Sequence, residues 1–149
     1  QVQSTLFKVH RYFLSRQSEV FETMFKLPPG DDNAKEEIIY VPDVTVTEFE
    51  ALLKFCYHGL PNDSKFWSDL LSISTRFIFD TARDQAVQRL SELLNGNPVE
   101  KIYLASKFNI NNWLREAYCD LCERSNPLEI PEAKRIGWET AILLAKARE

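Results

Sequence analysis

Glycine, cysteine and histidine are all scarce in this chain, and each scarcity excludes a class of site. Four glycines among 149 residues cannot build the glycine-rich loop that cradles a nucleotide phosphate. Cys56, Cys119 and Cys122 are the only cysteines, too few for a disulfide scaffold, which favours a reducing, intracellular compartment. His10 and His58 are the only histidines, and neither lies near a nucleophile motif. The sequence therefore predicts no catalytic residues and no enzyme.

Long apolar runs and an excess of positive charge are missing as well. No apolar stretch approaches the roughly 20 residues that a membrane-spanning helix needs, and no N-terminal segment has the pattern of a signal peptide. The formal net charge is −4, and no clustered face of lysine and arginine offsets phosphate repulsion. We therefore expect a cytoplasmic or nuclear protein that binds neither membranes nor nucleic acid.

Aromatic and aliphatic residues, in contrast, are plentiful. The hydrophobic fraction is 44%, with ten Phe, five Tyr and three Trp, which is enough to bury a core. The clearest break is 95–98, Asn-Gly-Asn-Pro, which combines a C-terminal glycine, a capping asparagine and a proline at the first helical position. We place a boundary there, with one domain over residues 1–95 and a helical extension over residues 96–149.

The N-terminal half mixes extended and helical patterns. Residues 1–9 alternate, and residues 38–41 are β-branched or aromatic, as is typical of short strands. Ser18 predicts the start of a helix, because its hydroxyl can accept from free backbone N–H groups. Thr45 and Glu48 have the spacing of a capping box, which predicts a second helix start.

From residue 66 onward the pattern predicts helices alone. The last one starts near Pro131 and is expected to bury Ile136 and Leu143 among others. An earlier helix is expected to continue to Ile78. The sequence thus predicts an α+β chain that is mostly helical, with short strands flanked by helices.

Residues 6–25, LFKVHRYFLSRQSEVFETMF, read F-x-x-H and then S-x-x-F-x-x-M-F. This order resembles the signature of BTB/POZ domains. The resemblance extends to residues 37–44, EIIYVPDV, and to residues 49–59, FEALLKFCYHG. It covers roughly residues 1–95. It implies a BTB/POZ-like fold followed by a C-terminal helical extension, acting as a protein–protein interaction module with no cofactor and no small-molecule substrate.

Two finer comparisons come with the resemblance. The phrases at 53–59, LKFCYHG, and 97–102, NPVEKI, look most like the BTB proteins of mushroom-forming fungi. Members of the family usually begin with a longer strand, which strand-exchanged dimers use. Only nine residues precede His10, so we expect that segment to be absent here.

The resemblance implies two kinds of protein partner. One is a second copy of the chain, in a homodimer. The other is a cullin, because some family members are substrate adaptors for cullin-3 type ubiquitin ligases. Such adaptors often carry an apolar-x-Glu motif in the loop after M-F, and the nearest match here is Ala34-Lys35-Glu36. Both kinds of association stay open at the level of sequence.

Five residues are candidates for binding a partner. Arg11, Tyr12 and Ser15 lie in the segment that BTB dimers use, by resemblance. Phe25 and Leu27 lead into a Pro-Gly loop, where exposed apolar side chains would mark a partner site. The alternative, that these are ordinary core or rim residues, also stays open.

The sequence 119–122, Cys-Asp-Leu-Cys, is formally a C-x-x-C motif. A zinc site needs four ligands, and no second pair lies at a suitable spacing. The motif also falls inside a predicted helix rather than after a strand. Reduced structural cysteines are the favoured interpretation, so no metal is predicted. A small helical metal-binding protein or enzyme that uses Cys119 and Cys122 is the alternative from another class.

Overall fold

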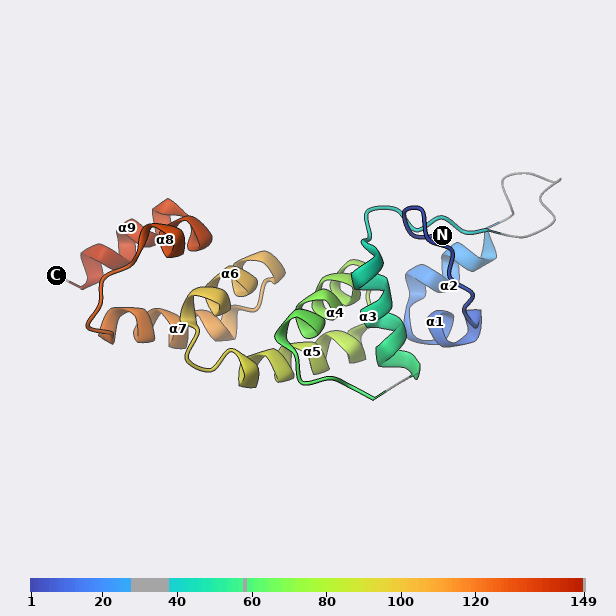
Figure 1. Cartoon of the computed structure of the whole chain (residues 1–149), viewed down its shortest axis with the longest axis horizontal. Coiled ribbons are helices and arrows are strands. Elements are labelled where there is room, and N and C mark those ends of the chain that lie inside the picture. The colour runs from blue at the N-terminus through green and yellow to red at the C-terminus, as the bar shows by residue number, and fades with distance from the viewer. Residues whose placement is uncertain (28–37, 58, 149) are drawn as a thin grey trace. The chain divides into compact units, whose positions relative to one another are not determined.

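The computed structural model describes residues 1–27, 38–57 and 59–148. These residues are mostly helical, as predicted, and they divide into two compact units, Gln1–Leu90 and Ser91–Glu149, here called unit 1 and unit 2. Five helices begin in unit 1 (Figure 1): α1 (Arg11–Gln17), α2 (Glu19–Lys26), α3 (Val46–Tyr57), α4 (Ser64–Arg76) and α5 (Asp80–Leu93). Four lie in unit 2: α6 (Pro98–Phe108), α7 (Asn111–Glu123), α8 (Ile130–Ile136) and α9 (Trp138–Ala147). None of the helices in the described part of the chain is long and apolar enough to cross a membrane.

The two segments predicted as strands are extended, but short strands are not confirmed in the residues described. Val2 and Thr5 form one isolated antiparallel bridge, with N···O distances of 3.0 and 2.9 Å. Residues 38–41 lie beside the first residue: the Val41 N–H donates to the Gln1 carbonyl at 2.9 Å, and the Gln1 amine donates to the Ile39 carbonyl. Gln1 is thus hydrogen-bonded to residues nearly forty positions away.

A buried serine forms the corner between α1 and α2. The Ser18 side-chain oxygen accepts from the Phe21 N–H at 3.2 Å, so Ser18 caps α2 as predicted. The same hydroxyl donates to the carbonyl of Phe77, at the end of α4. The Phe21 ring packs 5.1 Å from that of Phe77 and 5.6 Å from that of Phe79, between ring centroids. The corner is therefore fastened to α4 by both a hydrogen bond and aromatic packing.

The predicted capping box at the start of α3 is confirmed. The Glu48 N–H donates to Thr45 Oγ1 at 3.2 Å, and the Thr45 N–H donates to Glu48 Oε2 at 2.8 Å. One turn on, Phe49 is buried, and its ring centroid lies 4.9 Å from that of Phe7. α3 packs along α4, beside it in Figure 1. The N-terminal segment is thereby attached to the helical core through Phe7.

Two details of the predicted helices are wrong. α4 ends at Arg76, and Ile78 adopts a left-handed backbone with φ of 54° and a half-exposed side chain. The single helix predicted from Pro131 is two, because Gly137, with φ of 90°, separates α8 from α9. The break turns α9 so that Leu143 is 66% exposed, while its neighbour Leu144 is buried.

Unit 2 has its own hydrophobic core and its own hydrogen bonds between elements. The predicted turn and helix start near residue 97 are confirmed: Gly96 has φ of 86°, and Asn97 caps α6 by accepting from the Glu100 N–H at 3.2 Å. The Arg148 guanidinium donates to carbonyls of the segment that follows α7, including that of Asn126 at 2.8 Å. The buried core residues come from all four helices: Ile102, Ala117, Leu121, Ala133, Ile136, Ala141 and Leu144.

Removing the Phe49 ring should strongly destabilise the chain. Phe49 is 3% exposed, so Phe49→Ala should lower the free energy of unfolding by about 3–5 kcal/mol, as for other buried phenylalanines. Urea unfolding followed by circular dichroism measures this change. Leu60→Ala, at an exposed position of the same unit, should cost under about 0.5 kcal/mol. If Phe49→Ala lowered the free energy of unfolding as little as the control does, Phe49 would not lie on the buried face of α3.

An acidic-pH dependence should arise from Glu132. The Arg124 guanidinium hydrogen-bonds this carboxylate, with Nη1 at 2.8 Å from Oε1, and lowers the pKa of Glu132 from 4.5 to about 2. A depressed pKa contributes stability above pH 4.5 that is lost as the pH falls from there towards 2. Glu132→Gln should therefore cost about 1 kcal/mol at pH 7, because the pair is partly exposed, and progressively less below pH 4.5. The exposed Glu139→Gln is the control, and a cost that does not change with pH would contradict the assignment.

Candidate functional site

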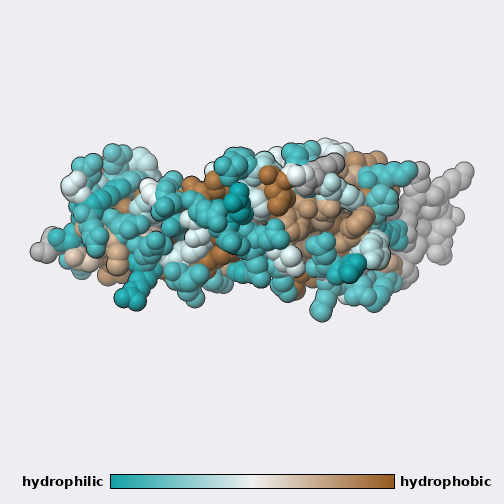
Figure 2. Space-filling model, turned by 90° about the horizontal axis from the view of Figure 1, so that it is seen from below, coloured by the Kyte–Doolittle hydropathy of each residue, from teal (hydrophilic) through white to brown (hydrophobic). Residues whose placement is uncertain are grey.

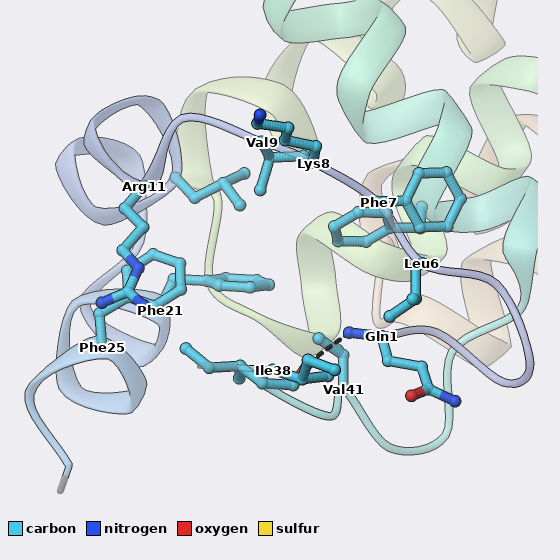
Figure 3. A pocket seen from close by; sticks show the side chains of 13 residues that line it. Gln1, Leu6, Phe7, Lys8, Val9, Arg11, Phe21, Phe25, Ile38 and Val41 are labelled. Atoms are coloured by element: carbon cyan, nitrogen blue, oxygen red, sulfur yellow. Dashed lines mark hydrogen bonds between the residues drawn. The ribbon is translucent and has the colours of Figure 1, made fainter. Parts of the chain in front are cut away.

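An open groove in unit 1 lies between two extended segments. Its volume is about 420 Å³. Figure 3 shows residues 6–9 along one side and residues 38–41 along the other, with Arg11, Phe21 and Phe25 at one end. The lining residues come from both segments and from α1, α2 and α3: Gln1, Leu6, Phe7, Lys8, Val9, Arg11, Leu14, Phe21, Phe25, Ile38, Ile39, Val41 and Phe49.

The groove has an apolar floor and a positive rim. Leu14, Phe21 and Phe49 are buried beneath it. Among the lining residues that the structure describes, the charged side chains are those of Lys8 and Arg11, and none is acidic. The Arg11 guanidinium carbon lies 5.5 Å from the centroid of the Phe25 ring, in a cation–π arrangement. In the described part of the chain, the groove therefore combines an apolar floor with basic side chains at its rim.

The backbone along one side of the groove makes no hydrogen bond to other described residues. Among the residues that the structure describes, the N–H and C=O groups of residues 6–9 make no hydrogen bond to another part of the chain. The side chains of this segment alternate: Leu6 and Lys8 are exposed, while Phe7 and Val9 are half-buried. The segment thus has the side-chain alternation of a strand with one buried face.

Four aromatic side chains form a second surface, here called the aromatic patch: His10, Tyr12, Phe13 and Tyr57. The Phe13 ring centroid lies 5.7 Å from that of Tyr12 and 5.1 Å from that of Tyr57. The His10 N–H donates to the Tyr57 hydroxyl at 3.3 Å. All four residues are exposed, and Tyr12 is 62% exposed. The patch joins α1 to the end of α3.

Basic side chains hold the patch in one arrangement. Arg16 Nη1 donates to the Tyr12 hydroxyl at 2.9 Å, and the Arg16 guanidinium carbon lies 5.9 Å from the Tyr12 ring centroid. Figure 2 shows that apolar side chains also gather on the visible face of unit 1, among mostly hydrophilic surroundings. Exposed aromatic and arginine side chains are the types that protein interfaces use most.

The five predicted partner-binding residues lie in different places. Arg11 and Phe25 come together at one end of the groove. Tyr12 is in the aromatic patch, and Ser15, on the same helix, donates to the Tyr12 carbonyl at 3.3 Å. Leu27 follows α2, is 62% exposed and belongs to neither surface. No comparison tests a role for these residues, so their partner-binding role stays a prediction.

Sequence reasoning missed several residues of both surfaces. The sequence analysis singles out neither Phe13 nor Tyr57, although both are exposed. Lys8 and Leu6 were seen as part of a strand but not as part of a groove. The alternation of residues 6–9 was the available signal, since an unpaired strand shows the same alternation as a paired one.

The cysteines are free, and none is among the lining residues of the groove. Cys119 is exposed on α7, and Cys122 packs partly against the core of unit 2. Burial raises the pKa of the Cys56 thiol. Within the described ranges, no group of three or more His, Cys, Asp or Glu side chains is placed to hold a metal ion. His58 and the Ala34–Glu36 segment lie outside the described residues.

The comparisons with known proteins agree with the resemblance seen in the sequence. The family model described as the BTB/POZ domain matches residues 1–94. No curated protein matches the chain. The matched residues make up more than half of the chain and include every residue of the groove and of the aromatic patch. The chain therefore belongs to the BTB/POZ domain family.

Proposed function

We propose that the chain associates with a second copy of itself through the aromatic patch. BTB/POZ domains are protein–protein interaction modules. The observation that carries the proposal is the exposure of four neighbouring aromatic rings, among them Tyr12 at 62%. Burying such rings against a partner removes apolar area from water and retains a hydrogen-bonding tip on each tyrosine.

The fixed arrangement of the patch supports this proposal. The hydrogen bonds from Arg16 to Tyr12 and from His10 to Tyr57 restrict both tyrosines before any partner arrives. A restricted side chain loses less conformational entropy on binding than a free one. A surface built on α1 and α3 is also self-complementary when two copies meet about a twofold axis, because each copy supplies the same rings.

Two further assignments are proposals of the same kind. We propose that the BTB/POZ domain ends near residue 95 and that residues 96–149 are a helical extension; the family match ends at residue 94, and unit 1 ends at Leu90. We also propose that the chain belongs with the BTB proteins of mushroom-forming fungi, on the phrases at 53–59 and 97–102.

The other candidate functions have less support. A role as adaptor for a cullin-3 type ligase rests on Ala34-Lys35-Glu36, which the structure does not describe. Enrichment of cullin-3 on the immobilised chain would test it. The metal-binding or enzymatic alternative rests on Cys119 and Cys122 alone, and metal analysis of the purified chain would test that. A cytoplasmic or nuclear location stays a prediction.

Light scattering over about a hundred-fold range of concentration tests the self-association. The wild-type mass should rise from 17.4 kDa towards twice that value. Tyr12→Ser should raise the dissociation constant of the dimer at least about ten-fold, because it removes a central aromatic group.

The matched control is Tyr40→Ser, since Tyr40 is 58% exposed and lies outside the patch. It should leave the dissociation constant within about two-fold of wild type. A chain that stays monomeric at every concentration would refute self-association. Equal effects of the two substitutions would show that the copies meet elsewhere than at the patch.

A further inference from the structure

We infer that His10 makes the self-association depend on pH: two copies associate while its imidazole is neutral and separate when the imidazole takes up a proton. The inference rests on the proposed self-association through the aromatic patch, and it adds a regulation to that same surface. An imidazole ordinarily gains its proton between about pH 5 and pH 8, so a modest acidification would be the signal.

His10 lies within the surface that a second copy would cover. Its ring centroid is 6.0 Å from that of Phe13 and 6.1 Å from that of Tyr57, and all three side chains are exposed. A copy that removes Phe13 and Tyr57 from water would therefore remove the neighbouring imidazole from water as well. Taking a charged group out of water is costly unless an opposite charge compensates it, and a neutral imidazole costs much less.

The contact between His10 and Tyr57 suits the neutral imidazole. The Tyr57 hydroxyl oxygen accepts from the His10 backbone N–H, and it also lies 3.3 Å from His10 Nδ1. With Nδ1 unprotonated, the hydroxyl can donate to Nδ1 while its oxygen accepts from the backbone. A protonated Nδ1 is itself a donor, so the hydroxyl proton must then turn away from the ring. Protonation thus changes the contact that restricts Tyr57 in the patch.

The charged side chains on the elements beside His10 are mostly basic. On residues 6–9, α1 and α3 they are Lys8, Arg11, Arg16, Glu48, Glu50 and Lys54. The remaining titratable groups there are Tyr12, Cys56 and Tyr57, whose side-chain types are ordinarily neutral below about pH 7.5. On these elements, an imidazolium would therefore have more positive neighbours than negative ones.

The two carboxylates of this set lie towards the other end of α3. Glu48 is in the capping box at the start of the helix and accepts from Thr45. Glu50 precedes Tyr57 by seven residues, or about 10 Å along a helix. Neither is placed to compensate a charge on His10. A second copy related by a twofold axis brings the same basic side chains again, and like charges brought together at an interface oppose association.

The number of protons sets the steepness of the effect. Two copies carry two His10 side chains, so association of neutral imidazoles excludes two protons. A ligand that binds only the separate chains raises the apparent dissociation constant of the dimer. With one proton excluded from each copy, the dissociation constant should rise as the pH falls through the range in which the imidazole is protonated.

Light scattering at about pH 7.5 and about pH 5.5 tests the inference. The dissociation constant of the wild-type dimer should be at least about ten-fold higher at the lower pH. In His10→Gln, whose side chain takes up no proton, it should differ less than about two-fold between the two conditions. His10→Lys carries a permanent charge and should raise the dissociation constant at least about ten-fold already at the higher pH. His58→Gln, at the other histidine of the chain, is the control and should keep the wild-type pH dependence.

An NMR titration of the His10 ring is an independent readout. At a concentration where the dimer dominates, the imidazole should take up its proton at a lower pH than in the dilute chain, because association excludes the charged form. Circular dichroism should show the same helical signal at both pH values, since carboxyl groups ordinarily titrate near about pH 4, below this range.

The contrary outcomes separate this inference from the proposed function. A dimer with the same dissociation constant at both pH values would overturn the inference and leave the self-association standing. So would wild-type pH dependence in His10→Gln, or a His10 ring that titrates identically in the dilute and the associated chain. A loss of helical signal between the two pH values would also overturn it, because dissociation would then follow unfolding. A chain that is monomeric at both pH values would refute the self-association and this inference with it.

Discussion

The buried hydroxyl of Ser18 holds the arrangement on which both surfaces of unit 1 depend. It accepts from the Phe21 N–H and donates to the Phe77 carbonyl, so one side chain caps α2 and joins the corner between α1 and α2 to the end of α4. Phe21, placed by this corner, lies beneath the groove. Because a buried hydroxyl without partners is costly, the two bonds strongly favour this single arrangement.

One short helix contributes to two different surfaces. Arg11 lines the groove, while the adjacent residues Tyr12 and Phe13 belong to the aromatic patch. A rotation of about 100° per residue along a helix explains how neighbours in sequence face different directions. Leu14 then returns to the core, where it is buried. Different sides of α1 thus face the groove, the aromatic patch and the core, so the orientation of this helix determines the shape of both surfaces.

Signals that act over a few residues could be predicted from sequence. The Ser18 cap, the Thr45–Glu48 capping box and the Gly96–Pro98 break all follow from local backbone chemistry. Features that arise from tertiary packing could not be predicted from the sequence. The groove forms only because residues 6–9 and 38–41 lie side by side, and no local sequence pattern predicts that contact. Burial of Lys101 beside Glu116, with Nζ and Oε2 at 3.4 Å, is likewise set by the packing of α6 and α7.

Amide hydrogen exchange, read residue by residue by NMR, tests most directly whether the Ser18 hydroxyl holds the corner of unit 1. In the wild-type chain, the amide of Phe21 should exchange slowly, because it donates to Ser18 Oγ in a buried corner. In Ser18→Ala, which removes both hydrogen bonds of the hydroxyl, this amide should exchange about ten-fold faster or more. Equal exchange rates in the two proteins would contradict the account.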